Sequence, residues 1–138
     1  MSPAYTRSWQ SYAVLVARLI FAAVFLLAVS LKLAGMGETA AYIAAAGFPM
    51  PSALAWLAAG FELLLVLGFV TGVLFMPTAL FAAAYVLFLA FAFHGPARWE
   101  GNEAEFGFFV DHFAFVAGLL YAAAHGPGRF ALNHVFDR

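Results

Sequence analysis

Cysteine is absent from this chain of 138 residues. Without thiols the protein has no disulfides, no thiolate metal site, no cysteine-held iron–sulfur cluster and no cysteine nucleophile. Charge is also scarce, because charged residues make up 9% of the chain, against about 25% in a typical soluble domain. The formal net charge is -1, so neither nucleic acid nor a strongly acidic partner is expected.

Hydrophobic residues are correspondingly abundant, at 66% of the chain. They form four long runs without polar alternation, at residues 12–34, 52–70, 74–93 and 106–124. Each run is close to the roughly 20 residues with which a helix crosses about 30 Å of hydrocarbon. Only helices and closed barrels satisfy their backbone groups in lipid, and barrel strands alternate. The sequence therefore predicts four transmembrane helices in a lipid bilayer.

The predicted fold is all-α, a single integral membrane four-helix bundle over residues 1–138. Between the first two runs, residues 38–46 predict a short helix that ends at Gly47, since Pro49 and Pro51 prevent its continuation. It carries few charges, so we expect it at the membrane interface, together with the tail after residue 128. Arg18 interrupts the first run, which is long for a signal-peptide core, so we expect that run to remain as a helix.

The distribution of basic residues predicts an orientation. Four spans place both termini on the same side of the membrane, where Arg7, Arg129 and Arg138 lie, while Lys32 and Arg98 lie on the other side. Basic residues are more frequent on the cytoplasmic side. The count of three against two therefore favours cytoplasmic termini.

Several ionisable residues lie within or at the edge of the apolar runs: Arg18, Lys32, Glu62, Asp111 and, beside it, His112. A charge near the bilayer centre costs roughly 2.5 to 3.5 kcal/mol, so these residues are candidates for function. Arg18 lies about 9 Å inside the first run and Glu62 about 12 Å from the end of the second. In antiparallel neighbours these depths are similar, and the spacing predicts a buried Arg18–Glu62 ion pair. Such a pair either fixes helix register or serves a substrate or proton, and the sequence leaves both open.

A second polar group is predicted at the opposite end of the bundle. Lys32 ends the first run, His94 ends the third, and Asp111 and His112 lie about one and a half turns into the fourth. We expect a Lys32–Asp111 pair with both histidines as polar neighbours. Lys32 is about 21 Å from Arg18 along the helix, so the two groups should not share partners. Two plainer interpretations stay open: Lys32 reaching the headgroups, and His94 as a loop residue at a helix end.

The order of several short patterns resembles the DoxX family of small four-helix bacterial membrane proteins. The patterns are Arg18 followed by Ser30-Leu31-Lys32-Leu33, residues 45–51, Glu62, residues 68–72, His94 with Trp99, and residues 126–128. The resemblance covers residues 12–133 or so. It departs at Asp111-His112, where many relatives carry Lys-Asn.

The resemblance implies a multi-pass protein of the bacterial inner membrane, either a quinone-linked redox protein or the membrane subunit of an oxidoreductase. The family takes its name from a subunit linked to a terminal quinol oxidase. Lys32, His94, Asp111 and His112 are then the candidate quinone-binding residues, since quinone carbonyls need donors and a proton source. The chain shows no electron carrier, so redox turnover would need a redox partner protein or a bound cofactor. Whether the chain is itself an enzyme stays open.

The alternative is a non-enzymatic scaffold or assembly subunit of a larger membrane, respiratory complex. Short loops and small-residue faces suit this role, and the ladder Ala114, Gly118 and Ala122 is expected to pack against another helix and carry Asp111 into the bundle. Both a homodimer and a hetero-complex stay open. Haem ligation by His94 and His112 is disfavoured, because the first two runs contain no histidine, and no metal site is predicted. Transport is disfavoured by the lack of an inverted repeat or a broken helix.

Overall fold

The computed structural model describes residues 8–132. Its helices are α1 (Ser8–Ala34), α2 (Met36–Ala45), α3 (Pro51–Thr71), α4 (Phe75–His94), the short 3-10 helix η1 (Pro96–Arg98) and α5 (Glu103–His125). The helices α1, α3, α4 and α5 are long and apolar enough to cross a membrane. The predicted all-α architecture, with four spans and one short helix between the first two, is confirmed.

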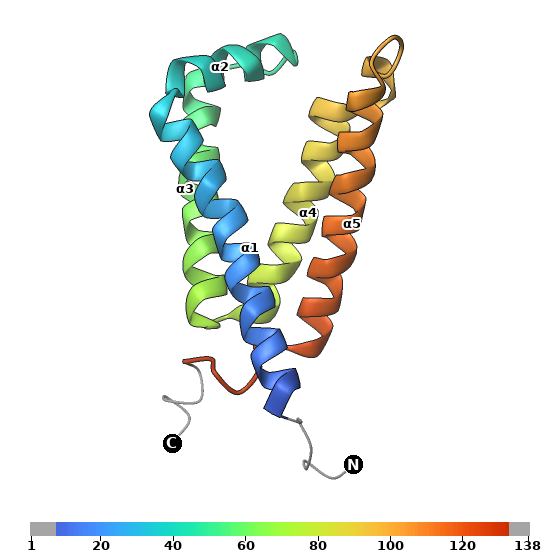
Figure 1. Ribbon diagram of the computed structural model, residues 1–138. Helices are drawn as coiled ribbons and strands as arrows, with labels where there is room; N and C mark the ends of the chain where they lie inside the picture. Colours follow the sequence, from blue (N-terminus) through green and yellow to red (C-terminus); the bar gives the residue numbers. More distant parts are fainter. Residues whose placement is uncertain (1–7, 133–138) are drawn as a thin grey trace.

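The long helices form two pairs that meet at one end (Figure 1). α1 packs along α3, α4 packs along α5, and α3 and α4 contact each other less extensively. The two pairs diverge from the α3–α4 turn, so that the molecule resembles a V in this view. The arrangement differs from a closed bundle because its helices separate toward the end that carries α2 and η1.

The vertex of the V depends on small residues and on left-handed backbone. Gly72 ends α3 with φ 74°, and its N–H donates to the carbonyl of Gly68 at 2.8 Å. A Cβ added at Gly68 would lie 2.5 Å from Oγ1 of Thr78 on α4. The absence of side chains at these positions therefore allows α3 and α4 to approach closely where the chain reverses.

The main core contains buried residues from all four long helices, including Phe25, Phe69, Phe75 and Leu119. Large apolar side chains on the outer faces of the same helices are exposed, Leu64 among them at 66%. An exposed apolar surface of this extent suits lipid better than water.

α2 lies across the open end of the V (Figure 1). Only Gly35 separates it from α1. The ring of Tyr42 stacks on Phe93 of α4 with centroids 5.1 Å apart, and Phe48, after α2, meets Phe88 edge-on. α2 therefore connects the two helix pairs at the end where they are furthest apart. The helix predicted at residues 38–46 is confirmed, and its location at the membrane interface stays a prediction.

Arg18 does not pair with Glu62, and the predicted ion pair is wrong. Its side chain is buried and donates to three backbone carbonyls: Nε to Phe69 at 3.0 Å, Nη2 to Val70 at 2.7 Å and Nη1 to Pro127 at 3.0 Å. Glu62 lies about 10 Å further back along α3 than Phe69. The end of α3 supplies carbonyls that have no helical partner and carry partial negative charge, so it attracts the guanidinium instead.

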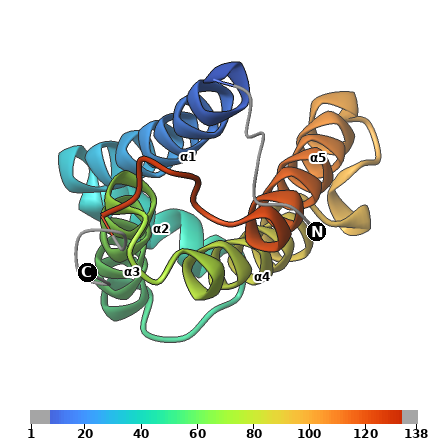
Figure 2. The ribbon, with the colours of Figure 1, turned by 90° about the horizontal axis from the view of Figure 1, so that it is seen from below.

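The segment after α5 folds back toward α3. Seen from below, residues 126–132 cross from the end of α5 to α3 (Figure 2), and the N–H of Leu132 donates to the carbonyl of Thr71 at 2.9 Å. Ala131 is buried. As far as residue 132, the tail therefore packs against the end of α3; its location at the membrane interface stays a prediction, and residues 133–138 lie outside the described part.

Candidate functional site

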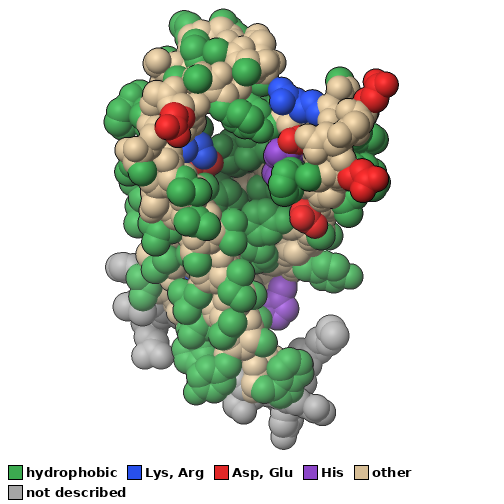
Figure 3. Space-filling model, turned by 45° about the horizontal axis from the view of Figure 1, so that its top comes forward, with side chains coloured by type: hydrophobic (Ala, Val, Ile, Leu, Met, Phe, Trp, Pro, Cys, Tyr) green, Lys and Arg blue, Asp and Glu red, His purple; other side chains and the backbone are tan. Residues whose placement is uncertain are grey.

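A cavity of about 930 Å³ lies between the two arms of the V, beneath α2. Figure 3 shows the hollow with basic and histidine side chains near its rim. Its walls are mainly aromatic and aliphatic, with Ile43, Phe48, Leu54, Phe61, Phe88 and Phe93 among the lining residues. The volume lies in the range of small-molecule sites, which are typically apolar with a few placed polar groups.

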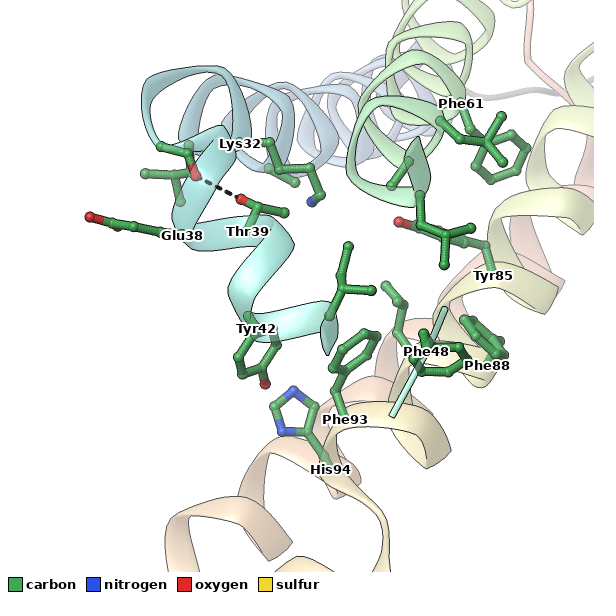
Figure 4. A pocket seen from close by; sticks show the side chains of 18 of the residues that line it. Lys32, Glu38, Thr39, Tyr42, Phe48, Phe61, Tyr85, Phe88, Phe93 and His94 are labelled. Atoms are coloured by element: carbon green, nitrogen blue, oxygen red, sulfur yellow. Dashed lines mark hydrogen bonds between the residues drawn. The ribbon is translucent and has the colours of Figure 1, made fainter. Parts of the chain in front are cut away.

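The first polar group of the cavity joins three helices. Nζ of Lys32 on α1 lies 2.8 Å from Oε1 of Glu62 on α3, and the hydroxyl of Tyr85 on α4 donates to the same oxygen at 2.8 Å. Lys32 and Tyr85 line the cavity. Figure 4 shows their polar ends directed toward each other, Lys32 from α1 and Tyr85 from α4. The cavity therefore has an ammonium and a phenol at one place in its wall.

Lys32 pairs with Glu62 rather than with Asp111, so the predicted Lys32–Asp111 pair is wrong. The last turn of α1 lies against α3, whereas Asp111 lies on α5, in the other arm. The Lys32 side chain is 21% exposed and that of Glu62 only 2%. The interpretation that Lys32 simply extends to the headgroups also fails, because its ammonium turns inward to a buried carboxylate.

Glu62 has one oxygen with two donors and one with none. Lys32 and Tyr85 both donate to Oε1, while the buried Oε2 accepts no hydrogen bond within residues 8–132. A buried carboxylate requires a charged partner to offset its desolvation. Lys32 supplies it, and the pair therefore fixes α1 against α3 at the wall of the cavity.

The second polar group is centred on His94, the last residue of α4. Its Nδ1 lies 2.7 Å from Oε2 of Glu105 on α5, and its ring lies 5.0 Å from that of His112. The backbone carbonyl of His94 accepts a bond from Nε1 of Trp99 at 2.8 Å. His94 does end a helix, but these contacts hold both its ring and its backbone, and the ring lines the cavity.

His112 and Asp111 point in different directions although they are adjacent. Nδ1 of His112 donates to the carbonyl of Phe108 at 2.7 Å, and His112 lines the cavity. Asp111 is exposed, is not among the lining residues, and makes no hydrogen bond or ion pair with another described residue. Successive residues of a helix differ by about 100° around its axis. Three of the four predicted site residues therefore border the cavity, and Asp111 does not.

The model of the DoxX family matches residues 13–95. The chain belongs to the DoxX family. It is also similar to the inner membrane protein YqjF of Escherichia coli strain K12, with 31% identity over 127 residues, which are 91% of this chain and 92% of that protein. No solved structure matches the chain. The resemblance inferred from the short motifs is thereby confirmed, and the protein is a multi-pass membrane protein of the DoxX type.

In this DoxX protein, sequence reasoning missed two residues of the cavity's polar groups. Tyr85 is the one tyrosine in the run 74–93, and a polar tip in an otherwise apolar run was an available signal. Glu105 pairs with His94 across the loop that contains η1. Its partner could not be inferred from spacing, because the path of that loop sets which turns of α4 and α5 face each other.

Proposed function

We propose that this DoxX protein binds a quinone in the cavity, as a quinone-linked redox protein or as the membrane subunit of an oxidoreductase. The observation that carries the proposal is the position of the polar groups. Lys32 and Tyr85 lie in one part of an apolar wall, and His94 and His112 lie in another. A quinone is a flat apolar ring with hydrogen-bond acceptors on opposite edges, so it suits a cavity with polar groups at two places.

The two groups offer different chemistry to such a ring. Lys32 has three ammonium protons and gives one bond to Glu62, so it retains donors for a carbonyl. His94 and His112 offer imidazole nitrogens, which donate or accept hydrogen bonds according to the tautomer. The surrounding phenylalanines supply faces against which an aromatic ring packs. An apolar ligand tail would leave between α1 and α5, which diverge toward the open end (Figure 1).

The proposal includes a partner protein, because the sequence shows no electron carrier of its own. A redox partner protein would exchange electrons with the bound quinone. The two proteins would form a hetero-complex, in which this chain, as a monomer or a homodimer, provides the quinone site in the membrane. We place the protein in the bacterial inner membrane, as the name of the related YqjF states for that protein, with cytoplasmic termini. Lys32 is paired within the bundle, which leaves Arg98 on the far side and favours this orientation.

Quinone retention tests the proposal. The protein is purified in mild detergent, and extracted quinone is quantified per mole of protein for wild type, Tyr85→Phe, and the double variant Lys32→Met/Glu62→Gln. The double variant removes both members of the ion pair, so it leaves no buried unpaired charge. Both variants should retain less quinone than wild type, and Leu64→Ala on the exposed face serves as the matched control. Wild-type quinone content in both cavity variants would contradict the proposal.

A scaffold role is the second candidate, and a separate observation favours it. Asp111 is an exposed carboxylate within a membrane-spanning helix, where a charge is costly without a partner. The ladder of small residues on α5 does not favour it, because Gly118 lies against Phe21 of α1 within the same chain. If Asp111 binds another subunit, Asp111→Asn should lose that subunit in affinity purification from native membranes while keeping its quinone content. Recovery of the same complex with Asp111→Asn would exclude Asp111 as the contact.

A further inference from the structure

Aromatic contacts hold α1 and α5 together near the vertex of the V. The ring of Phe115 on α5 packs against Phe21 and Phe25 of α1, with centroids 5.4 and 5.8 Å apart. Gly118 belongs to the same contact, since a Cβ added there would lie 3.6 Å from Cζ of Phe21. The face of α5 that carries Gly118 is therefore the face toward α1. Beyond this contact the two helices diverge toward the open end (Figures 1 and 2).

Asp111 lies on the same face of α5 as Gly118. The two residues are seven apart, which is about two turns and about 10.5 Å along the helix. Gly118 faces Phe21, but α1 has diverged from α5 at the level of Asp111 (Figure 1), and Asp111 is exposed. The adjacent His112 lines the cavity. Asp111 therefore lies beside the cavity, on the side where α1 and α5 separate.

α1 supplies the opposite edge of this side of the cavity. Ala28 and Leu31 both line the cavity, and Ala28 is about one turn beyond Phe25 toward the open end. Leu31 is 64% exposed, so it lies at the rim of the cavity rather than inside it. The hollow reaches the surface of the molecule in Figure 3. We call the gap between Ala28 and Leu31 on α1 and Asp111 on α5 the side opening; one of its edges is apolar and the other carries a carboxylate.

The interior of the cavity would by itself attract anions. The ammonium of Lys32 retains donors beyond its bond to Glu62, and bilayers contain lipids with anionic headgroups. An anionic amphiphile in the cavity would have its charge near the carboxylate of Asp111. Two like charges on the order of 10 Å apart, at an effective dielectric constant of about 20, lower the affinity roughly tenfold. The neutral ring of a quinone carries no such penalty.

We propose that the side opening is the entrance through which the cavity takes its ligand from the bilayer, and that Asp111 selects neutral amphiphiles over anionic ones at this entrance. The inference rests on the proposed function, to which it adds the route of the ligand and the basis of its selection. The ring of the ligand occupies the cavity, and its apolar tail lies in the side opening against Ala28 and Leu31. Asp111 repels the phosphate and carboxylate headgroups that Lys32 would otherwise hold.

A competition experiment tests the selection by charge. Full-length protein in uncharged detergent binds a benzoquinone with a decyl tail, followed by quenching of tryptophan fluorescence, and dodecanoate or dodecanol is added as competitor. In Asp111→Asn the decyl benzoquinone should bind as in wild type, while dodecanoate should compete about tenfold better. Dodecanol has the same chain without the charge, so it should compete equally in both proteins. Glu103→Gln is the matched control, because it removes an exposed carboxylate from the first turn of the same helix, and it should behave as wild type.

A bulkier residue at the rim tests the route. Ala28→Phe narrows the side opening, so the decyl benzoquinone should bind about tenfold more weakly, the equivalent of roughly two buried methylenes. Unsubstituted benzoquinone has no tail and should keep its wild-type affinity, which also shows that the variant is folded. Ala23→Phe is the control, because Ala23 is exposed on another face of α1, and it should leave both affinities unchanged.

The possible outcomes separate the inference from the proposed function. Equal competition by dodecanoate in wild type and Asp111→Asn would overturn the selection by Asp111. Equal affinities of wild type and Ala28→Phe for the decyl benzoquinone, or an equal loss of both quinones in that variant, would overturn the route. Failure of wild type to bind either quinone would instead refute the proposed function on which the inference rests.

Discussion

Replacing Arg18 with methionine should destabilise the protein through the loss of three hydrogen bonds. The guanidinium donates to the carbonyls of Phe69, Val70 and Pro127, and a bond to a charged group contributes about 1.5 to 3 kcal/mol. Arg18 is 2% exposed, so its removal also relieves a desolvation cost of several kcal/mol. The opposing contributions lead us to expect a net loss of about 2 to 4 kcal/mol in the free energy of unfolding.

The assay is equilibrium unfolding in mixed micelles, followed by far-UV circular dichroism. Arg18→Lys serves as the comparison, because one ammonium lacks the planar fork that reaches several acceptors at once. It should recover part of the loss and remain less stable than wild type.

A double-mutant cycle with Glu62→Gln separates this arrangement from an Arg18–Glu62 ion pair. Arg18 and Glu62 share no partner in the described structure, so their effects should add within about 0.5 kcal/mol. Two results would refute the reasoning: wild-type stability of Arg18→Met, or a coupling energy well above that limit.

Two further predictions concern the cavity wall and the vertex. Lys32→Met should lower the free energy of unfolding by about 3 to 5 kcal/mol, because it leaves the buried carboxylate of Glu62 without its charged partner. In thermal unfolding, Lys32→Met/Glu62→Gln should be more stable than Lys32→Met, because the unpaired charge is gone. Equal stability of the two variants would argue against the ion pair. Gly72→Ala should lower the melting temperature, since φ is 74° and the added Cβ would lie 2.6 Å from that of Ala131, with strain of about 1 to 3 kcal/mol. Gly101→Ala is its control, having φ 71° and no heavy atom within 4 Å of the added Cβ, and an equal loss in both would show that crowding contributes nothing.

The helices could be predicted from the sequence because the bilayer requires long apolar runs, and the observed bounds follow those runs. The position of each residue along its helix could also be counted from the sequence. This count placed Lys32, His94 and His112 near the same end of the bundle, where all three line the cavity. Depth alone does not say which helices are neighbours. The pairing of Lys32 with Glu62 depends on α1 lying against α3, and the separation of the two arms removed Asp111 from reach.

The partners of Arg18 illustrate a different limit. All three are backbone carbonyls. Every residue has one, so residue types do not indicate which carbonyls Arg18 binds. A search for an acidic partner leads to Glu62, the nearest carboxylate by depth. The end of a helix supplies the same negative potential without a side chain.

The contact between Arg18 and Pro127 has a consequence for biogenesis. Arg18 enters the bilayer with the first helix, but two of its acceptors lie at the end of α3 and the third lies after α5. During synthesis the guanidinium therefore cannot form all three hydrogen bonds until the chain has been made as far as Pro127. Residues 126–132 close the structure by binding both the first helix and the end of the third. The last bond of Arg18 thus comes from a segment outside the membrane spans, and a ribosome stalled before residue 127 would hold a first helix whose guanidinium lacks one of its three acceptors.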